Sequence, residues 1–244
     1  MDQKIYENID QRFAKYYKWV EENKESLLSQ AELEKYQYDW PRFALSIGLM
    51  DKYYGNKELQ VLELGGEGVS TKFLRAYFPN WNISNYCDDL RQKNWDLKDG
   101  QYDLIVSMEV VEHLSDVNED HFEWNASFLY SGLMNCLEES NRVLNKKGRI
   151  FLTTPNALSN IHFYKMIIGE IPHQYSPHVR EYTYEELFGV IERMKMPVRN
   201  YECLEALCVC WDFSYITDFI KESKGNSKNR HSTLFFDLGV NKVK

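Results

Sequence analysis

A short apolar run that ends in glycines constrains the fold more than any other stretch of this sequence. Residues Leu59–Leu64 have the composition of a buried strand, and Gly65–Gly68 follows directly, with glycine at three of its four positions. Ser70 and Thr71 are typical residues at the start of a helix, which we expect over Lys72–Phe78. The free N–H groups at such a helix start face the turn, and glycine lets a ligand approach the backbone. This unit therefore predicts an anion-binding site.

The rest of the chain alternates predicted strands and helices. Strands are indicated at 82–86, 102–108, 149–154, 204–211 and 232–237, and helices at 127–144 (ended by Asn145–Gly148), 183–194 and 215–222. This alternation is typical of a parallel sheet covered on both faces. We expect an α/β, Rossmann-like, doubly wound and mostly parallel sheet of seven strands. Only about 40 residues separate Glu63 from Asp103, so we expect the helix and strand between them to be shortened.

The chain divides into two predicted parts. Residues 1–58 form a helical extension, interrupted at Trp40-Pro41, and residues 59–244 form the main domain. Four residues of the extension share one helix face: Phe13, Tyr16, Tyr17 and Val20. Within the main domain, the loop-rich covering segment (155–182) is expected to lie over the substrate, because long loops at the ligand edge of a sheet commonly carry function. The alternative is an ordinary surface loop.

The composition argues against several classes of protein. A formal net charge of −8 and the lack of lysine or arginine runs make a nucleic-acid partner unfavourable, since such a partner needs a basic face. The five cysteines are scattered, odd in number and without Cys-x-x-Cys spacing, so neither a disulfide framework nor a zinc site is expected. The sequence has no signal-like start and no long apolar run, so we expect a cytoplasmic protein without a membrane span. The oligomeric state stays open.

A cluster of polar residues follows the predicted strand at 102–108. Glu109, Glu112 and His113 have the spacing i, i+3 and i+4, which places their side chains on one face of a helix. The cluster also lies at the carboxyl end of a strand, where α/β sheets bind ligands. Charged groups in an apolar segment are costly without partners, which favours a functional site. The alternative is a solvated helix start stabilised by the helix dipole.

The glycine unit resembles the first motif of the class I S-adenosylmethionine-dependent methyltransferases, acid-x-Gly-x-Gly-x-Gly after the first strand. Glu63 and Gly65 match the acid and the first glycine. In strict register Glu67 stands at the middle glycine, whereas a gap of one residue aligns Gly66 and Gly68. The unit also approaches a dinucleotide-binding fingerprint, but the third glycine of that fingerprint is missing, which argues against a nicotinamide enzyme.

The resemblance implies S-adenosylmethionine as the cofactor. Its expected contacts are Glu63, Gly65, Gly66, Gly68, Asp88, Asp89, Leu90 and Met108. Asp88 or Asp89 follows the second strand, where an acid can bind ribose hydroxyls. The adenine contact is expected among Asp88, Asp89 and Leu90, because the segment that follows them is shortened.

Three further motifs narrow the resemblance. The run Glu-Val-Val-Glu-His-Leu at 109–114 is similar to a signature of the branch that includes the ubiquinone-biosynthesis O-methyltransferases, and Arg142–Asn156 and Pro177–Leu187 are also typical of it. The resemblance covers residues 59–238 and implies methyl transfer to a hydroxyl oxygen. Residues 156–182 resemble members that act in bacterial glycan assembly, so a sugar or glycan hydroxyl is the first expectation for the acceptor. Expected substrate contacts are His173, Tyr175, Arg180 and Tyr182.

A narrower resemblance concerns a metal. Small-RNA 2′-O-methyltransferases carry Glu-x-x-Glu-His and a later His-x-x-Glu-aromatic-Thr, which Glu109, Glu112, His113 and His178 match. Two carboxylates and two imidazoles suit a divalent cation such as Mg²⁺ or Mn²⁺, which lowers the pKa of a bound hydroxyl. Without a metal, His113 or His178 acts as general base, and both are expected catalytic residues together with Glu109. His173 is the alternative to His178 as the distal ligand.

Other acceptors and one inactive form stay open. A quinone-like phenol or a small natural product is the second expectation for the acceptor. The 2′-hydroxyl of RNA is the third, since the metal motif favours it and the net charge disfavours it. Because Glu67 and Val69 depart from the glycine motif in strict register, a methyltransferase fold that serves as a partner subunit without turnover is a further alternative.

Overall fold

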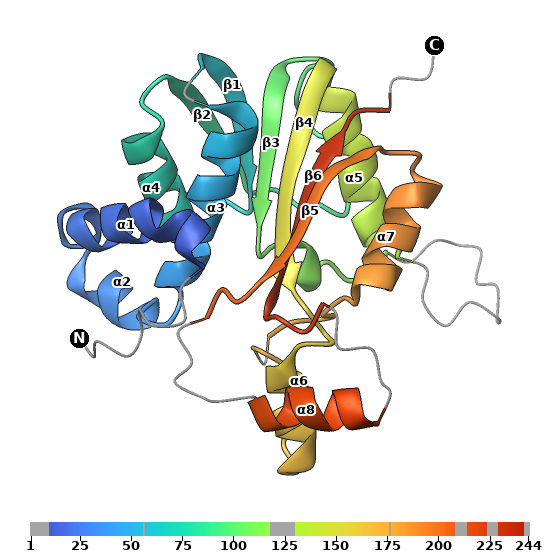
Figure 1. The fold of residues 1–244 in the computed structure, drawn as a ribbon. Coiled ribbons are helices and arrows are strands. Elements are labelled where there is room, and N and C mark those ends of the chain that lie inside the picture. Colours follow the sequence, from blue (N-terminus) through green and yellow to red (C-terminus); the bar gives the residue numbers. More distant parts are fainter. Residues whose placement is uncertain are drawn as a thin grey trace.

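One mixed sheet organises the protein. The computed structural model describes residues 10–55, 57–117, 130–175, 177–207, 214–223 and 229–241. Its strands are β1 (Leu59–Leu64), β2 (Trp81–Tyr86), β3 (Tyr102–Met108), β4 (Leu144–Pro155), β5 (Val198–Leu204) and β6 (Thr233–Gly239). They lie in the order β2-β1-β3-β4-β6-β5 (Figure 1), with the first four parallel and β6 antiparallel to both neighbours. The predicted mostly parallel α/β fold is confirmed, with six strands in the described chain where seven were expected.

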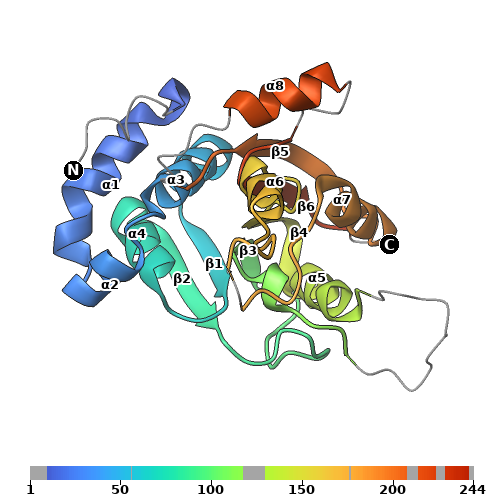
Figure 2. The same ribbon diagram turned by 90° about the horizontal axis from the view of Figure 1, so that it is seen from below.

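Helices cover both faces of this sheet. They are α1 (Ala14–Leu27), α2 (Gln30–Lys35), α3 (Trp40–Tyr54), α4 (Val69–Tyr77), α5 (Ser131–Val143), α6 (Asn160–Ile167), α7 (Tyr184–Arg193) and α8 (Ser214–Glu222). Figure 2 shows α3 and α4 on one side of the strands and α5 and α7 on the other. Two buried apolar clusters match this division, since Val61 packs with the first group and Leu62 with the second. The alternation follows from the period of two along a strand.

The N-terminal helices belong to the same core as the sheet. The predicted apolar face is confirmed, because four residues near the start are buried: Phe13, Tyr16, Tyr17 and Val20. They share one cluster with Val61 of β1 and Phe73 of α4. Trp40 and Pro41 open α3, where a proline in the first turn loses no helical hydrogen bond. None of the helices in the described part of the chain is long and apolar enough to span a membrane.

The segment between β2 and β3 replaces a helix and strand with an irregular connection. Residues 87–101 contain neither element, which confirms the predicted shortening. Trp95 is buried and stacks on Tyr86, with ring centroids 4.9 Å apart. The backbone N–H of Trp95 donates to Glu139 Oε2 at 2.9 Å, and the Arg142 guanidinium donates to the backbone carbonyls of Trp95 and Leu97. The ion pair between Glu139 and Arg142 of α5 therefore fixes the position of this segment, in place of strand pairing.

Three predicted elements differ from the structure. The strand expected at 204–211 is β5, which lies earlier, and residues 208–211 are outside the described chain. Helix α5 begins at Ser131 and runs directly into β4, so Asn145–Gly148 is not a helix stop; residues 127–129 are also outside the described chain. The covering segment contains α6, which begins after Ser159 and is followed by Gly169 at φ +78°. Serine before a helix and glycine after it are its ordinary boundary signals.

Replacing Glu139 with glutamine is expected to lower stability in a pH-dependent way. Burial raises the pKa of Glu139, but hydrogen bonds from Arg142 and Trp95 outweigh it, so the pKa lies below its ordinary value of 4.5. The carboxylate's contribution is therefore complete above that value and is lost as the pH falls below it. We expect E139Q to unfold about 1–3 kcal/mol more easily at pH 7, and the difference to shrink in acid.

Urea unfolding of E139Q and wild type between pH 3 and 7 measures this, with E138Q as the matched control. Glu138 is the neighbouring acid, but its side chain is exposed and pairs only with Lys93 at 3.3 Å. A difference for E139Q that is as small as that for E138Q, or that does not depend on pH, contradicts the anchoring role.

Candidate functional site

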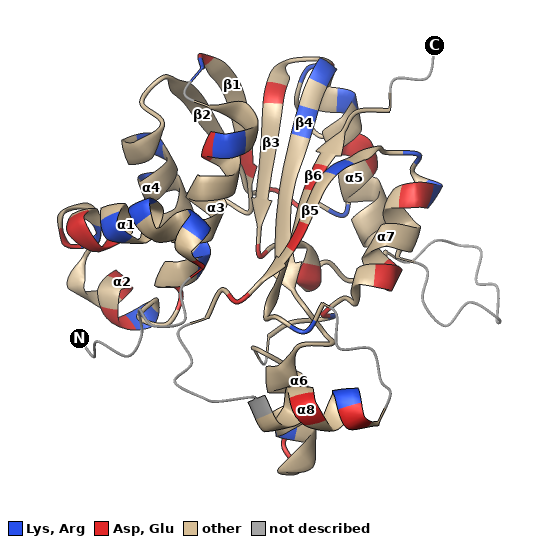
Figure 3. Ribbon diagram, viewed as in Figure 1, with Lys and Arg blue, Asp and Glu red and all other residues tan. Residues whose placement is uncertain are grey.

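The candidate site lies where the parallel strands end. The carboxyl ends of β1, β3 and β4 point toward one edge of the sheet, and α6 and α8 lie beyond that edge (Figure 1, bottom). Ligands of open α/β sheets bind at this edge. Acidic and basic residues are interspersed over the helices in the view of Figure 3. Two groups of predicted site residues meet at this edge: the glycine loop after β1 and the Glu-x-x-Glu-His run after β3.

The glycine loop has a backbone that side chains would obstruct. Gly65 and Gly66 have φ of +95° and +89°, a region that favours glycine. A Cβ on Gly65 would lie 3.0 Å from Val110 Cγ2, so the loop also packs closely on the chain after β3. The Gly68 N–H donates to Thr71 Oγ1 at 3.0 Å, and Gly68 is the residue directly before α4. Strand, loop and helix thus form the predicted unit.

The buried side chain of Glu63 stabilises this loop through hydrogen bonds. Its side chain is buried and accepts hydrogen bonds from the hydroxyls of Ser70 and Thr71, the latter at 2.5 Å, and from Asn85 Nδ2 at 3.0 Å. Burial raises the pKa of Glu63, and these hydrogen bonds oppose that rise. Asn85 also donates to the Gly66 carbonyl at 3.3 Å. Asn85 was not predicted as a site residue; its signal is a polar side chain on a strand paired directly with Glu63.

The other predicted cofactor residues have different environments. Asp88 and Asp89 are exposed just after β2, and the Asp89 carboxylate accepts from Arg91 Nε at 2.8 Å, which holds its pKa well below the usual range. Leu90 is buried in the sheet core with Trp95, so its side chain packs inward. Met108 is half-buried at the end of β3.

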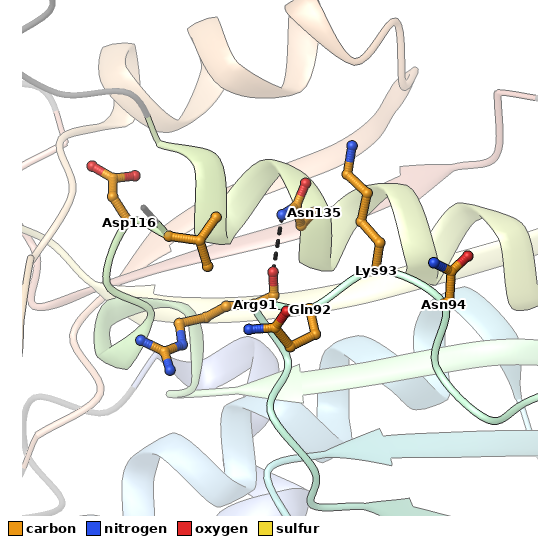
Figure 4. A pocket seen from close by; sticks show the side chains of 7 residues that line it. Arg91, Gln92, Lys93, Asn94, Asp116 and Asn135 are labelled. Atoms are coloured by element: carbon orange, nitrogen blue, oxygen red, sulfur yellow. Dashed lines mark hydrogen bonds between the residues drawn. The ribbon is translucent and has the colours of Figure 1, made fainter. Parts of the chain in front are cut away.

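A cavity lies beside the segment that follows Asp89. Its volume is about 650 Å³, and it is lined by Arg91, Gln92, Lys93, Asn94, Asp116, Val117 and Asn135. Figure 4 shows Asn135 of α5 pointing toward the Arg91 backbone, where its amide donates to the carbonyl at 2.9 Å. The lining is mostly polar and includes no residue of the glycine loop and neither histidine of the predicted site. The cavity was not predicted.

The Glu-x-x-Glu-His run does not form the expected helix face. A 3₁₀ helix, Val111–His113, follows β3, and Glu109 before it has φ +55°, which is uncommon outside glycine. Glu109 therefore turns toward the N-terminal helices, where its Oε2 lies 3.2 Å from Arg42 of α3. Thr153 Oγ1 donates to Glu109 Oε1 at 2.8 Å. Arg42 is a site residue that the sequence reading missed, because it lies in the extension outside the motifs.

Glu112, His113 and His178 come together. One ligand atom of each lies within 4.8 Å of the others, and the centroids of the two imidazole rings are 4.9 Å apart. Glu112 is fully buried, and its Oε2 accepts from Thr154 Oγ1 at 2.9 Å. Its Oε1 has no hydrogen-bond partner in the described part of the chain and lies 3.9 Å from His178 Nε2. Among the described residues Glu109 and His173 are not part of this group.

The charges of this group are set by burial. Burial raises the pKa of Glu112 well above its usual value, and the nearby charge of Glu109 adds to this rise. Burial and the neighbouring His178 lower the pKa of His113. A buried carboxylate oxygen without a partner is costly, so the position facing the two histidines suits a cation or a proton donor.

A second carboxylate supports His178. Glu181 Oε1 accepts from His178 Nδ1 at 2.5 Å, and its Oε2 contacts His162 Nε2. Burial alone raises the pKa of Glu181, but the hydrogen bonds from the two histidines outweigh it and lower the pKa to about 2. Glu181 was missed as a site residue, although it is the glutamate of the His-x-x-Glu motif.

The predicted substrate residues are dispersed around the histidines. The exposed Tyr175 ring contacts the His178 ring at 5.4 Å, and Lys165 donates to the His173 carbonyl. Arg180 pairs with Glu186 at 2.6 Å. Tyr182 is 1% exposed and packs in the sheet core, so its ring lies beneath the site surface. Tyr175 thus has the accessible ring of this set, and Tyr182 has a packing role.

Comparisons with known proteins show the fold. No protein-family model matches the chain, and no curated protein matches it. One similar solved structure is an Archaeoglobus fulgidus S-adenosylmethionine-dependent methyltransferase, with a TM-score of 0.52 and 13% identity over 86% of this chain and 100% of that one. A second is a Haloferax volcanii putative methyltransferase in complex with the Trm112 activator, with a TM-score of 0.51 and 13% identity over 95% of this chain and 98% of that one. A third is a Burkholderia thailandensis 1,6-didemethyltoxoflavin-N1-methyltransferase with bound S-adenosylhomocysteine, with a TM-score of 0.51 and 9% identity over 93% of this chain and 87% of that one. The chain therefore has the fold of S-adenosylmethionine-dependent methyltransferases.

Replacing Arg42 with methionine is expected to destabilise the protein strongly. The Arg42 and Glu109 side chains are only 14% and 15% exposed, so removing the cation leaves a carboxylate in a largely buried position. Such a change costs about 3 kcal/mol, and R42M/E109Q recovers part of that loss because the uncompensated charge is removed. Guanidinium unfolding of the two variants measures both values. R75M removes an exposed pair with Glu67 and is the control; an equal loss in R42M and R75M contradicts the pairing argument.

Proposed function

We propose that this chain is an S-adenosylmethionine-dependent O-methyltransferase. The observation that carries the proposal is the position of the Glu112 Oε1 atom, which has no hydrogen-bond partner among the described residues and faces two histidines at the sheet edge that also holds the glycine loop. A donor site and a group able to activate a hydroxyl are both needed for this reaction, and both lie at one edge of a methyltransferase fold. The fold supports the donor, and the cluster supports the oxygen acceptor.

The glycine loop is the proposed donor site. S-adenosylmethionine, when bound, supplies the methyl group. The backbone at Gly66, which no side chain of its own covers, is suited to the polar end of this molecule, and Asp88 or Asp89 is suited to its ribose. Glu63 keeps the loop in place through Ser70, Thr71 and Asn85, and so acts from behind the loop. The enzyme's main task is alignment of the acceptor oxygen with the methyl carbon.

Glu112, His113 and His178 are the proposed metal ligands. One carboxylate and two imidazoles form a donor set that suits a divalent cation such as Mg²⁺ or Mn²⁺ and leaves positions for acceptor oxygens. A bound cation would lower the pKa of the acceptor hydroxyl. Glu109, which the sequence also predicted as a ligand, is paired with Arg42 and Thr153, so we assign it the role of balancing the charge beside the ligands. In the absence of a cation, a neutral histidine of this pair accepts the hydroxyl proton.

The acceptor proposed first is a hydroxyl of a sugar or glycan. The exposed Tyr175 ring beside His178 gives an amphipathic surface on which a sugar face can pack. The net charge of −8 disfavours RNA. A quinone-like phenol or a small natural product is the second candidate.

Removing Glu63 is expected to weaken donor binding. In E63A two hydroxyls and one amide lose their acceptor, so the loop geometry is lost and the affinity for S-adenosylhomocysteine falls at least tenfold, or about 1.4 kcal/mol. Calorimetry measures this, with E67A as the control because Glu67 lies on the same loop but is exposed and pairs outward with Arg75. N85A is a milder second variant if E63A does not fold. A wild type that binds neither the donor nor its product at millimolar concentration favours the inactive partner subunit instead.

Mn²⁺ is expected to bind the metal-free protein through Glu112. E112Q keeps the volume of the side chain but removes its charge, and we expect it to weaken Mn²⁺ binding at least tenfold, whereas E109Q weakens it less. Electron paramagnetic resonance titration of free Mn²⁺ measures both. Wild type that fails to bind Mn²⁺ or Mg²⁺ eliminates the metal and leaves the histidines as bases. An equal loss in both variants returns Glu109 to the ligand set.

A further inference from the structure

A chain of four polar side chains runs behind the histidine cluster. It leads from Ser159, before α6, through His162 and Glu181 to His178. His162 is 2% exposed and the Glu181 side chain is 4% exposed, so neither reaches solvent. The proposed function assigns a role to His178 alone. The other three members of the chain need an explanation of their own, because buried polar groups are costly unless their hydrogen bonds are satisfied.

The hydrogen bonds to Glu181 Oε1 determine where the proton of His178 lies. This oxygen accepts the backbone N–H groups of Gln174 at 2.8 Å and Tyr175 at 3.4 Å, which can only donate. An oxygen that already accepts two N–H groups is disfavoured as a donor, so the proton in its bond with His178 lies on Nδ1. In a neutral ring the Nε2 then carries a lone pair. That Nε2 is the atom 3.9 Å from the partnerless oxygen of Glu112.

The other oxygen of Glu181 also faces a histidine, but through the other ring nitrogen. Oε2 contacts Nε2 of His162, and Nδ1 of the same ring contacts the Ser159 hydroxyl, which can donate to it. His162 is therefore expected to carry its proton on Nε2. The chain holds two histidines in opposite tautomers on one carboxylate. Its far end is fixed by α6, since Ser159 precedes that helix and the N–H of Phe163 donates to its carbonyl at 3.3 Å.

We propose that Glu181 is a positioning residue, held by His162 and Ser159, that fixes His178 in its Nδ1–H tautomer and directs the Nε2 lone pair at Glu112. This rests on the proposed function only for the use of that lone pair as a ligand or base. The hydrogen bond on the far side of an imidazole sets its tautomer and ring orientation. The same carboxylate binds the backbone of Gln174 and Tyr175, so one residue orients His178 and shapes the covering segment around it.

Histidine ring spectra test the tautomers without donor, metal or acceptor. The protein has six histidines, so long-range ¹H–¹⁵N correlations of the metal-free ¹⁵N-labelled chain are resolvable, and H178Q and H162Q assign the two rings by loss of signal. We expect His178 as Nδ1–H and His162 as Nε2–H at neutral pH. Either ring in the other tautomer, or both in the same one, overturns the proposal.

Two replacements of Glu181 separate positioning from packing. In E181Q the backbone N–H groups retain the amide oxygen at the Oε1 position, so His178 keeps its tautomer, while the amide NH₂ faces His162 and switches that ring to Nδ1–H. E181M fills the same space without an acceptor, so His178 is released to Nε2–H. Unchanged His178 signals in folded E181M overturn the proposal, and if E181M does not fold, the wild-type and E181Q spectra decide it.

Binding measurements connect the tautomer to the site. We expect Mn²⁺ affinity near the wild-type value in E181Q and about 10- to 100-fold weaker in E181M, with S-adenosylhomocysteine binding unchanged in both. Loss of donor binding in both variants points to a structural role for Glu181 and counts against positioning. A wild type that binds no Mn²⁺ removes the metal but leaves the tautomer result standing, so failure of the proposed function and failure of this inference are distinguishable.

Discussion

The register of the parallel strands is the constraint on which the site depends. The pairing of β1 with β2 sets Asn85 directly beside Glu63, and the two side chains together hold the glycine loop. The pairing of β3 with β4 sets Thr153 beside Met108, so the two threonines that precede the last residue of β4 donate hydrogen bonds to Glu109 and Glu112. A slip of one residue would turn each of these side chains to the opposite face. Both halves of the site are therefore consequences of sheet pairing, and apolar packing on the two faces enforces it.

Glu112 connects the sheet edge to the segment that covers it. Its backbone carbonyl accepts the N–H groups of Val179 and Arg180, at 2.9 and 3.0 Å. These bonds bring His178 over the buried carboxylate, and Glu181 then orients the ring from behind. The covering segment therefore docks through backbone hydrogen bonds to a residue whose side chain belongs to the proposed metal site. Changes in the position of the segment and in the environment of Glu112 are thus coupled through one residue.

Much of this arrangement follows from local sequence rules. The glycine unit and the α7 start, where Thr183 and Glu186 form a capping box, are short-range patterns, and the structure has both where they were expected. The features that differed depend on tertiary contacts. Arg42 reaches Glu109 from a distant helix, and the left-handed backbone of Glu109 replaces the expected helix face. Glu181 is visible in the sequence only as part of a motif, because its role comes from bonds to two histidines that the fold brings together.

The two glutamates after β3 show why spacing alone could not assign their roles. At i and i+3 they are equivalent in sequence, and a regular helix would present them together. The positive φ of Glu109 separates them, so Glu109 pairs with the Arg42 cation, while Glu112 stays buried with one oxygen that has no hydrogen-bond partner among the described residues. Burial raises the pKa of Glu112, the charge of Glu109 adds to this rise, and the Arg42 cation opposes it. Two identical side chains therefore have different partners because of one backbone angle and one arginine, and the N-terminal helices that carry this arginine contribute to the candidate site.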